Sequence, residues 1–342
     1  MLRLALPSKG ELEEPTLAFL RACGLAVDRA NARQYTAGIA TLRNTSVLFQ
    51  RAPDIPAKVA EGSVDLGITG LDTVKEFIHP DSDCIVLLED LDYGQCDLVA
   101  AVPETWIDVS SMADLVELAE EMRARGTELR VATKYTRLTR QFFLRKGLNY
   151  FSLVASTGAM EVAPTMGFAD IIVDLTSSGA TLRENGLRTL SDGTILRSQA
   201  CLVGNLACLR ADAEALEDTK SILELMEARL RAEEYYSVTA NIRGDSAEAV
   251  AQGVMTQPQV AGIRGPTVAK VYSRYGQEQD WFALTVVIRK HDLLCAVEHL
   301  RAMGGSSVTV HSPKYVFEAE TQSYRHLLDA LKQGRPPEAQ NE

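Results

Sequence analysis

A run of small polar residues from Thr176 to Thr181 directly follows the apolar segment Ala169–Leu175, which carries Asp174 near its end. The pattern predicts a strand, a tight loop and a helix that starts near Ala180, so that loop amides meet the positive end of the helix dipole. Gly179 lets the backbone approach an anion closely. Further hydroxyl donors are Ser177, Ser178 and Thr181. The segment predicts a site for a phosphorylated ribose whose hydroxyls bind Asp174, although an ordinary capped strand–helix junction would use the same residues.

A second polar loop, Leu6-Pro-Ser-Lys-Gly-Glu-Leu12, also lies between an expected strand and an expected helix. Lys9 stands where its ammonium group can reach a polyphosphate. Ser8 and Glu11 have the spacing of a capping box, which gives these two residues a purely structural alternative.

Three further segments place polar side chains after expected strands or at helix starts. The segment Gly67–Asp72 holds two glycines and an acid, which is a weak pattern by itself, and Glu161 lies at a possible helix start. The segment Ala132–Arg140 holds three cations that can face an anion or remain solvated, namely Lys134, Arg137 and Arg140. Open α/β sheets bind ligands at such strand ends. Because no Ser-His-Asp or Cys-His arrangement is present, we expect positioning and charge stabilisation rather than covalent catalysis.

The composition excludes several classes of protein. A net charge of −11 disfavours a nucleic-acid groove, and no run approaches the roughly 18 apolar residues of a membrane span. The N-terminus turns polar too soon for a secretory signal, so we expect a cytoplasmic protein. Six singly spaced cysteines and five dispersed histidines make a zinc site or a His-held metal improbable, and we expect reduced thiols.

The first two hundred residues alternate β-rich and helical patterns, which predicts an α/β fold with a largely parallel sheet. The expected strands are Leu2–Leu6, Val64–Ile68, Cys84–Leu88, Asp97–Val102, Leu129–Thr133, Asp170–Asp174 and Ala200–Val203. The expected helices are Glu14–Ala22, Ile55–Glu61, Met112–Arg125 and Leu138–Lys146.

A weak internal repeat indicates two similar lobes around a cleft. Each unit begins with an expected strand, at Leu2 or at Leu129, which is followed by a helix. Each unit then ends with an expected strand that starts at an aspartate, Asp65 or Asp170. Any two βα units look partly alike, so this is an interpretation of modest patterns. We expect a first lobe of residues 1–90 and 185–210 and a second lobe of residues 91–184.

The pattern changes after a charged helix expected at residues 211–234, which we interpret as a connector. Residues 235–332 read as strand, helix, strand, strand, helix and strand, the βαββαβ order of a ferredoxin-like domain. The polar, Pro-containing tail at residues 333–342 is expected to be disordered.

Taken together, these segments resemble the long form of the ATP phosphoribosyltransferase family over nearly the whole chain. The most specific match is Glu-Val-Ala-Pro at residues 161–164 combined with the run from Asp174 to Leu187. Other matching segments are Leu6–Gly10, Arg51–Pro56, Val64–Asp72, Gly94–Leu98 and Ala132–Tyr135.

The resemblance implies a fold and a reaction. The fold is a two-lobed, periplasmic-binding-protein-like catalytic core with a C-terminal ferredoxin-like regulatory domain. The reaction joins ATP and 5-phosphoribosyl 1-diphosphate, with Mg²⁺, to give N1-(5-phosphoribosyl)-ATP and diphosphate in histidine biosynthesis. It also implies homo-oligomers, from dimers to hexamers, and histidine as an effector that contacts Thr267. The metal ligands are not implied.

The resemblance also assigns site residues. Those expected to bind 5-phosphoribosyl 1-diphosphate are Asp174, Thr176, Ser177, Ser178, Gly179, Ala180 and Thr181. Those expected to bind the nucleotide are Lys9, Gly10, Glu11, Arg51, Asp72 and Lys134. Those expected to act in catalysis are Lys9, Glu161 and Asp174.

Two departures from the family pattern keep alternatives open. Glu11 stands where the family usually has an arginine, and the C-terminal domain is more similar to the plant-type variant than to the common bacterial one. A catalytically inactive regulatory paralogue therefore remains an alternative. The second alternative is a solute-binding module, which also has two lobes but needs no phosphate loop or appended domain.

Overall fold

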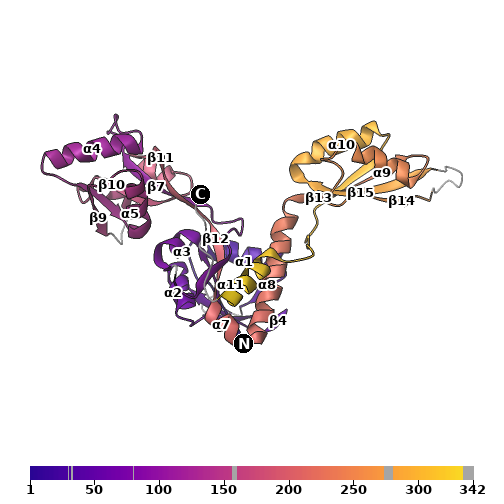
Figure 1. Cartoon of the computed structure of the whole chain (residues 1–342), viewed down its shortest axis with the longest axis horizontal. Helices are drawn as coiled ribbons and strands as arrows, with labels where there is room; N and C mark the ends of the chain where they lie inside the picture. Colours follow the sequence, from indigo (N-terminus) through magenta and orange to yellow (C-terminus); the bar gives the residue numbers. More distant parts are fainter. Residues whose placement is uncertain (30, 32–33, 80, 156–159, 273–279, 334–342) are drawn as a thin grey trace. The chain divides into compact units, whose positions relative to one another are not determined.

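The computed structural model of the chain describes residues 1–29, 31, 34–79, 81–155, 160–272 and 280–333. Two compact units are present, Met1–Lys220 with the segment from Ser323 onward, and Ser221–Gln322. Figure 1 shows both units coloured along the sequence. Of the tail predicted at 333–342, Gln333 is the last residue of helix α11, Gln322–Gln333, and residues 334–342 lie outside the described residues. None of the helices in the described ranges combines the length and apolarity that a membrane span requires.

The first lobe is built on a seven-stranded sheet of order β2-β3-β4-β1-β5-β12-β6. Its strands are β1 Leu2–Pro7, β2 Val27–Asp28, β3 Thr36–Ile39, β4 Leu42–Gln50, β5 Leu66–Gly70, β6 Cys84–Leu88 and β12 Ala200–Asn205. Its helices are α1 Glu13–Ala22, α2 Ile55–Ala60, α3 Leu71–Phe77 and α7 Leu206–Ala211. Strands β4, β1 and β5 run parallel, so their carboxyl ends lie at one edge of the sheet.

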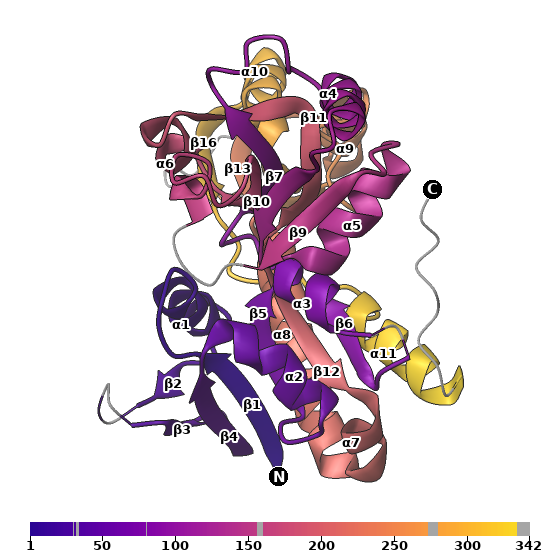
Figure 2. The same ribbon diagram turned by 90° about the vertical axis from the view of Figure 1, so that its left-hand side faces the viewer.

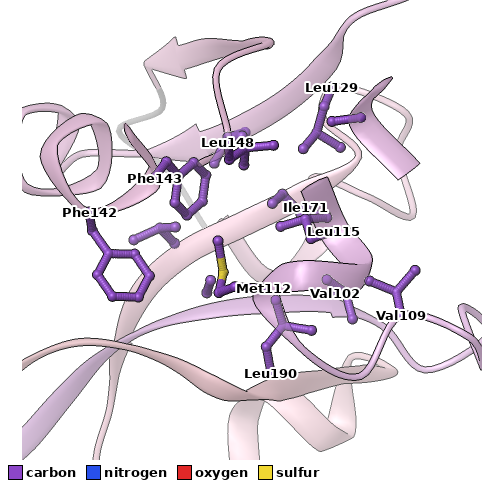
Figure 3. Packing of buried hydrophobic residues seen from close by; sticks show 14 of the residues in the cluster. Val102, Val109, Met112, Leu115, Leu129, Phe142, Phe143, Leu148, Ile171 and Leu190 are labelled. Carbon is purple, nitrogen blue, oxygen red and sulfur yellow. The ribbon is translucent and has the colours of Figure 1, made fainter. Parts of the chain in front are cut away.

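The second lobe has a five-stranded sheet of order β11-β7-β10-β8-β9. Its strands are β7 Cys96–Pro103, β8 Leu129–Thr133, β9 Phe151–Ala155, β10 Ile171–Thr176 and β11 Leu187–Ser198. Its helices are α4 Met112–Ala124, α5 Thr136–Arg145 and α6 Ala180–Glu184. Figure 3 shows the core of this lobe, where α4 and α5 bury Met112, Leu115 and Phe143 against the sheet. Burying each such side chain contributes about 1.5–3 kcal/mol.

The two-lobed core predicted from the sequence is confirmed, but two details of that prediction are wrong. The sheets are mixed rather than largely parallel, because β12 runs antiparallel to both neighbours and β7 runs antiparallel to β10 and β11. The chain also returns to the first lobe later than expected. Residues 187–198 pair with β7 of the second lobe, and only Ala200 rejoins the first sheet.

A matching pair of ion clamps identifies the two lobes as repeats of one unit. Arg3 at the start of β1 donates from its amide and guanidinium to Asp65 at 2.6–3.1 Å and to the Gly62 carbonyl. Arg130 at the start of β8 donates in the same way to Asp170 at 2.8–3.2 Å and to the carbonyl of Gly167. Each clamp joins the first strand of its unit to a later strand that precedes a helix, β5 before α3 in the first lobe and β10 before α6 in the second. Figure 2 shows the two sheets that these strands belong to.

The second unit has the predicted βαββαβ order, and the ferredoxin-like prediction is confirmed. Its elements are β13 Tyr235–Arg243, α9 Ala247–Met255, β14 Thr267–Lys270, β15 Trp281–Arg289, α10 Leu293–Ala302 and β16 Ser306–His311. The antiparallel sheet has the order β14-β15-β13-β16. Alternate residues of β13, including Val238 and Ala240, are buried in its core.

The boundaries of this unit differ from the predicted ones at both ends. The connector helix α8, Ala213–Ala232, crosses the boundary at residue 220 instead of forming a separate segment. The final helix α11, Gln322–Gln333, falls at the predicted end of the C-terminal domain but groups with the first unit. Leu327 and Ala330 are fully buried, and Arg210 donates to the carbonyl of Leu331 at 3.2 Å. These contacts explain why the last helix belongs to the first unit.

Candidate functional site

The loop after β10 folds into a small hydrogen-bonded ring. The hydroxyl of Thr176 accepts the amide of Gly179 at 2.9 Å, and the hydroxyl of Ser178 accepts the amide of Ala180 at 3.3 Å. Gly179 has a φ of 70°, in the left-handed region that glycine adopts without strain. Within the described chain the amides of Ser177 and Ser178 have no hydrogen-bond partner. The ring therefore presents free amide donors that an anion can bind.

Polar groups on the outside of this ring add to its affinity for anions. The side chains of Ser177, Ser178 and Thr181 are exposed. Arg183 on α6 donates to the carbonyl of Ser178 at 3.2 Å, which holds a guanidinium beside the loop. Arg183 was not among the residues predicted from the sequence. Its position four residues after Gly179, one helical turn away, is the local signal that could have identified it.

Asp174 and Lys134 form a partly buried ion pair at the carboxyl ends of β10 and β8. Lys134 Nζ lies 3.6 Å from the carboxylate, and the side chains are 53% and 14% exposed for Lys134 and Asp174 respectively. Burial raises the pKa of Asp174, while the charge of Lys134 and the amide of Leu175, which donates at 2.9 Å, lower it. The nearby charge of Glu161 raises it again. This corner of the second lobe therefore brings together the predicted Asp174, Lys134 and Glu161.

The cations of α5 do not gather as the sequence allowed. Arg137 donates from its amide and its guanidinium to Glu76 of the first lobe at 2.8 and 2.9 Å. The guanidinium of Arg140 lies 6.0 Å from the centre of the Phe151 ring. Only Lys134 of the three predicted cations is at the candidate site, because the other two side chains have structural partners.

Lys9, Gly10 and Arg51 follow adjacent parallel strands of the first lobe. The amide of Ser8 donates to the carbonyl of Gln50 at 2.7 Å, which joins the two strand ends. Lys9 is exposed, and Gly10 has a φ of 84°. Arg51 is 63% exposed and donates to Asp54 at 2.9 and 3.2 Å. Both cations can reach a ligand at this edge.

The capping box considered for Ser8 and Glu11 is wrong. The chain turns at Gly10, α1 starts only at Glu13, and its N-cap residue Leu12 makes no side-chain hydrogen bond. Glu11 is exposed. The loop is therefore not held by helix capping and leaves Glu11 free of that structural role.

Asp72 lies at the junction of the lobes. Its side chain is buried and accepts hydroxyl donors from Ser198 at 2.7 Å, Tyr135 at 2.8 Å and Thr73 at 3.1 Å. Burial and the charge of Asp72 raise the pKa of Tyr135, and the charge of Asp174 raises it further. Tyr135 therefore contacts Asp72 and is close enough to Asp174 for that charge to act on its hydroxyl. Sequence reasoning missed Tyr135 and Ser198, because their roles depend on partners 63 and 126 residues away.

Thr267, the predicted effector contact, starts the edge strand β14. It is paired with Thr285, Thr285 with Thr239, and Thr239 with Thr309, so one threonine from each strand forms a row across the sheet. The Thr239 and Thr285 hydroxyls lie 2.9 Å apart. Because the neighbours of Thr239 on β13 point into the core, this row lies on the opposite face of the sheet. The face offers polar contacts to a small ligand.

The chain is similar to known proteins over nearly its whole length. A family model described as ATP phosphoribosyltransferase matches residues 51–228, and one described as HisG, C-terminal domain, matches residues 232–312. A protein of Arabidopsis thaliana named ATP phosphoribosyltransferase 2, chloroplastic, is 42% identical over 96% of this chain and 80% of its own length. An ATP phosphoribosyltransferase of Rhodopseudomonas palustris strain BisB18 is 39% identical over 96% and 98% of the respective chains.

A solved structure supports the same grouping for the core. It is the ATP phosphoribosyl transferase (HisG:HisZ) complex from Thermotoga maritima, which matches with a TM-score of 0.51 and 25% identity. The match covers 66% of this chain and 98% of that chain.

Proposed function

Because this chain belongs to the ATP phosphoribosyltransferase family, we propose that its second lobe binds 5-phosphoribosyl 1-diphosphate and that its first lobe binds ATP. The enzyme condenses these substrates to N1-(5-phosphoribosyl)-ATP and diphosphate, the first step of histidine biosynthesis. The observation that carries the assignment of lobes is the ring at Thr176–Ala180, whose free amides suit a phosphate.

In this proposal the 5-phosphate binds the amides and hydroxyls of Thr176–Thr181, and Arg183 adds a positive charge. Asp174, at the end of the same strand, accepts hydrogen bonds from the ribose hydroxyls. A partly buried carboxylate suits this task, because a desolvated acceptor binds hydroxyls more strongly than a hydrated one does. The ribose is thereby fixed with its anomeric carbon toward the lobe junction.

The chemistry requires little more than positioning and charge. N1 of the adenine forms a bond to the anomeric carbon while the bond from that carbon to the diphosphate oxygen breaks. Positive charge develops on the ribose, and the carboxylates of Asp174 and Glu161 offset it. Lys134, half exposed beside Asp174, offsets the negative charge of the departing diphosphate.

In this proposal ATP lies at the carboxyl ends of β1 and β4. Lys9 and Arg51 bind its phosphates, and Gly10 allows the backbone to approach them closely. The side chain of Glu11 repels phosphate, so it faces away from the triphosphate or accepts a bond from the base or sugar. Asp72, already satisfied by three hydroxyls, acts on the nucleotide through the position of the lobe junction rather than by pairing with a cation.

Magnesium fits this arrangement only as an ion shared with substrate. In the described part of the chain no group of three or more His, Cys, Asp or Glu side chains could hold a metal. Mg²⁺ commonly takes one or two carboxylates together with substrate phosphates. Asp174 and Glu161 are the carboxylates suited to it, and the ion would supply charge neutralisation at the diphosphate.

The test is release of diphosphate, which must require both ATP and 5-phosphoribosyl 1-diphosphate. Thr176→Val removes the hydroxyl that closes the ring and is expected to raise the KM for 5-phosphoribosyl 1-diphosphate about tenfold, with the KM for ATP unchanged. Thr189→Val, on an exposed position of β11, is the matched control. An effect on ATP alone would contradict the assignment of lobes.

Regulation by histidine is proposed for the threonine face of the second unit. A small amino acid offers donors and acceptors that match Thr267 and its row. Thr267→Val should weaken inhibition by histidine without changing turnover in its absence. Thr256→Val, whose hydroxyl donates to the Gly253 carbonyl at a helix end, is the control.

Assembly and location complete the proposal. We expect homodimers that associate to hexamers, which the mass measured by gel filtration with and without histidine would test. All six cysteines lie in the described chain as free thiols, which is consistent with a reducing compartment such as the cytoplasm.

A further inference from the structure

Helix α5 of the second lobe is not capped by its own residues. Its N-cap residue, Tyr135, makes no side-chain hydrogen bond to the amides of the first turn. Such amides have no partner within the helix, and an unpaired buried amide costs free energy. The start of α5 therefore depends on groups from elsewhere.

Glu76 of the first lobe supplies the cap. One of its carboxylate oxygens accepts the Arg137 amide at 2.8 Å, and the other accepts the Leu138 amide at 2.9 Å. The Arg137 guanidinium donates back to the Glu76 carbonyl at 2.9 Å. The Glu76 side chain is buried, with 5% of the residue exposed. A carboxylate at this place also interacts favourably with the helix dipole.

A second carboxylate of α3 forms a hydrogen bond next to the start of α5. Asp72 precedes Glu76 by four residues, so both project from one face of the helix. Asp72 accepts the Tyr135 hydroxyl at 2.8 Å, and the Tyr135 amide donates to the Thr133 hydroxyl at 3.0 Å. Helix α3 thus fixes both the residue before α5 and its first turn, and Figure 2 shows α3 at the junction of the lobes.

Lys134 stands between these fixed points. Its neighbours in the chain, Thr133 and Tyr135, are 0% and 5% exposed, while its own ammonium group reaches Asp174 at 3.6 Å. We propose that Glu76 is a positioning residue: from the first lobe, its two hydrogen bonds to the start of α5 hold Lys134 in register with Asp174. This inference rests on the proposed binding of 5-phosphoribosyl 1-diphosphate at that pair. Glu76 itself does not touch the substrate.

The test compares two helix caps of one lobe in the full-length enzyme. Glu76→Ala removes the cap of α5, which crosses the lobes, and Glu76→Gln keeps the shape but replaces one acceptor with a donor. Asp114→Asn is the matched control, because Asp114 belongs to the capping box of α4 entirely inside the second lobe. Asp174→Ala serves as the reference for loss of the proposed site.

We expect Glu76→Ala to lower kcat/KM for 5-phosphoribosyl 1-diphosphate about tenfold, because small displacements of a reacting group are costly. Glu76→Gln should lie between this variant and the wild type. Hydrogen exchange at the amides of Arg137 and Leu138 should accelerate in both. Asp114→Asn should show a comparable fall in Tm but a kcat/KM within about twofold of wild type.

Three results would overturn the inference. If Glu76→Ala kept the kcat/KM of the Asp114→Asn control while Asp174→Ala lost activity, the proposed site would stand and the positioning role would fail. If Asp174→Ala turned over like the wild type, the proposed site itself would fail, and the role of Glu76 with it. Where Glu76→Ala does not fold, Glu76→Gln with unchanged exchange and unchanged kcat/KM would equally overturn it.

Discussion

The two lobes are copies of one structural unit that differ where the strand meets the helix. In the first lobe β5 ends at Gly70 and α3 starts at the next residue, whereas in the second lobe three residues separate Thr176 of β10 from Ala180 of α6. The ion clamps Arg3–Asp65 and Arg130–Asp170 are the same in both. Three inserted residues thus convert a structural junction into a loop with free amides, while the scaffold stays constant.

The corresponding strand positions differ in the same sense. Four residues after the clamp aspartate, the first lobe has Thr69 and the second has Asp174. Thr69 is fully buried and donates to the carbonyl of Ala52 at 2.8 Å. Asp174 instead pairs with the half-exposed Lys134 at the carboxyl ends of β10 and β8. One position stabilises its lobe, and the other is available for a ligand.

Substitution of Asp174 and of Thr69 should give the greatest difference in turnover between the two lobes. Asp174→Ala should lower turnover by about 10²–10³-fold, because a preorganised charge at the reacting ribose is lost. Thr69→Val should leave turnover within about twofold but lower the free energy of unfolding by about 1–3 kcal/mol, since the partly buried Ala52 carbonyl loses its hydroxyl donor. Diphosphate release and urea unfolding measure the two effects. Equal losses of turnover would show that the lobes are not specialised.

The clamps should stabilise both lobes but to different extents. Asp65→Ala is expected to cost about 3 kcal/mol of unfolding free energy and Asp170→Ala about 2 kcal/mol, because their side chains are 7% and 19% exposed. Each change leaves a backbone amide without its acceptor and an arginine without its carboxylate partner. Urea unfolding of both variants, with the exposed-pair variant Glu61→Ala as the control, provides the measurement. A larger loss for Asp170→Ala would reverse the predicted order.

A smaller difference in KM is expected between alanine variants of two glycines in the second lobe, Gly179 and Gly186. Gly179 and Gly186 have φ values of 70° and 66°, so alanine costs about 1 kcal/mol of stability at either place. Only at Gly179 would the new Cβ lie 2.9 Å from the Arg183 guanidinium and disturb the anion ring. We expect the KM for 5-phosphoribosyl 1-diphosphate to rise about tenfold for Gly179→Ala alone. A similar rise in KM for Gly186→Ala would show that backbone strain, and not the loop at Thr176–Ala180, causes the effect.

The smallest expected effect is a shift in the pH dependence of kcat/KM. Burial raises the pKa of Asp174, and Lys134 opposes this shift. Activity requires the ionised carboxylate, so kcat/KM falls as the pH drops through that pKa. Lys134→Gln removes the lowering charge, and the acid limb of the pH profile should move to higher pH. Lys146→Gln, which breaks the ion pair with Asp192 at 2.9 Å in the same lobe, should leave the limb in place. A shift in the opposite direction would contradict the role of Lys134.

The sequence predicted those features that depend on neighbouring residues. The loop at Thr176–Thr181, the strand that carries Asp174 and the βαββαβ order were all readable, because residue types and spacing determine them locally. The hairpin β3–β4 was missed, although alternate residues of β4 such as Val47 and Phe49 are buried. Strand β11 was missed because its polar Asp192-Gly193 step and its irregular pairing with β7 break the alternation.

The contacts that join the lobes could not be predicted. Glu76 and Ser198 act through partners 61 to 126 residues away, and no local pattern marks such residues. The same reason applies to Arg137, whose guanidinium is directed at the first lobe rather than at an anion. Local patterns therefore located the ligand loop, whereas only the folded chain identifies what holds the two lobes in register.

A crystal structure with 5-phosphoribosyl 1-diphosphate and Mg²⁺ would show directly which lobe binds the 5-phosphate. We expect the 5-phosphate within about 3 Å of the Ser177 and Ser178 amides, with the ribose hydroxyls on Asp174. A phosphate bound instead beside Lys9 in the first lobe, with the second-lobe loop empty, would contradict it.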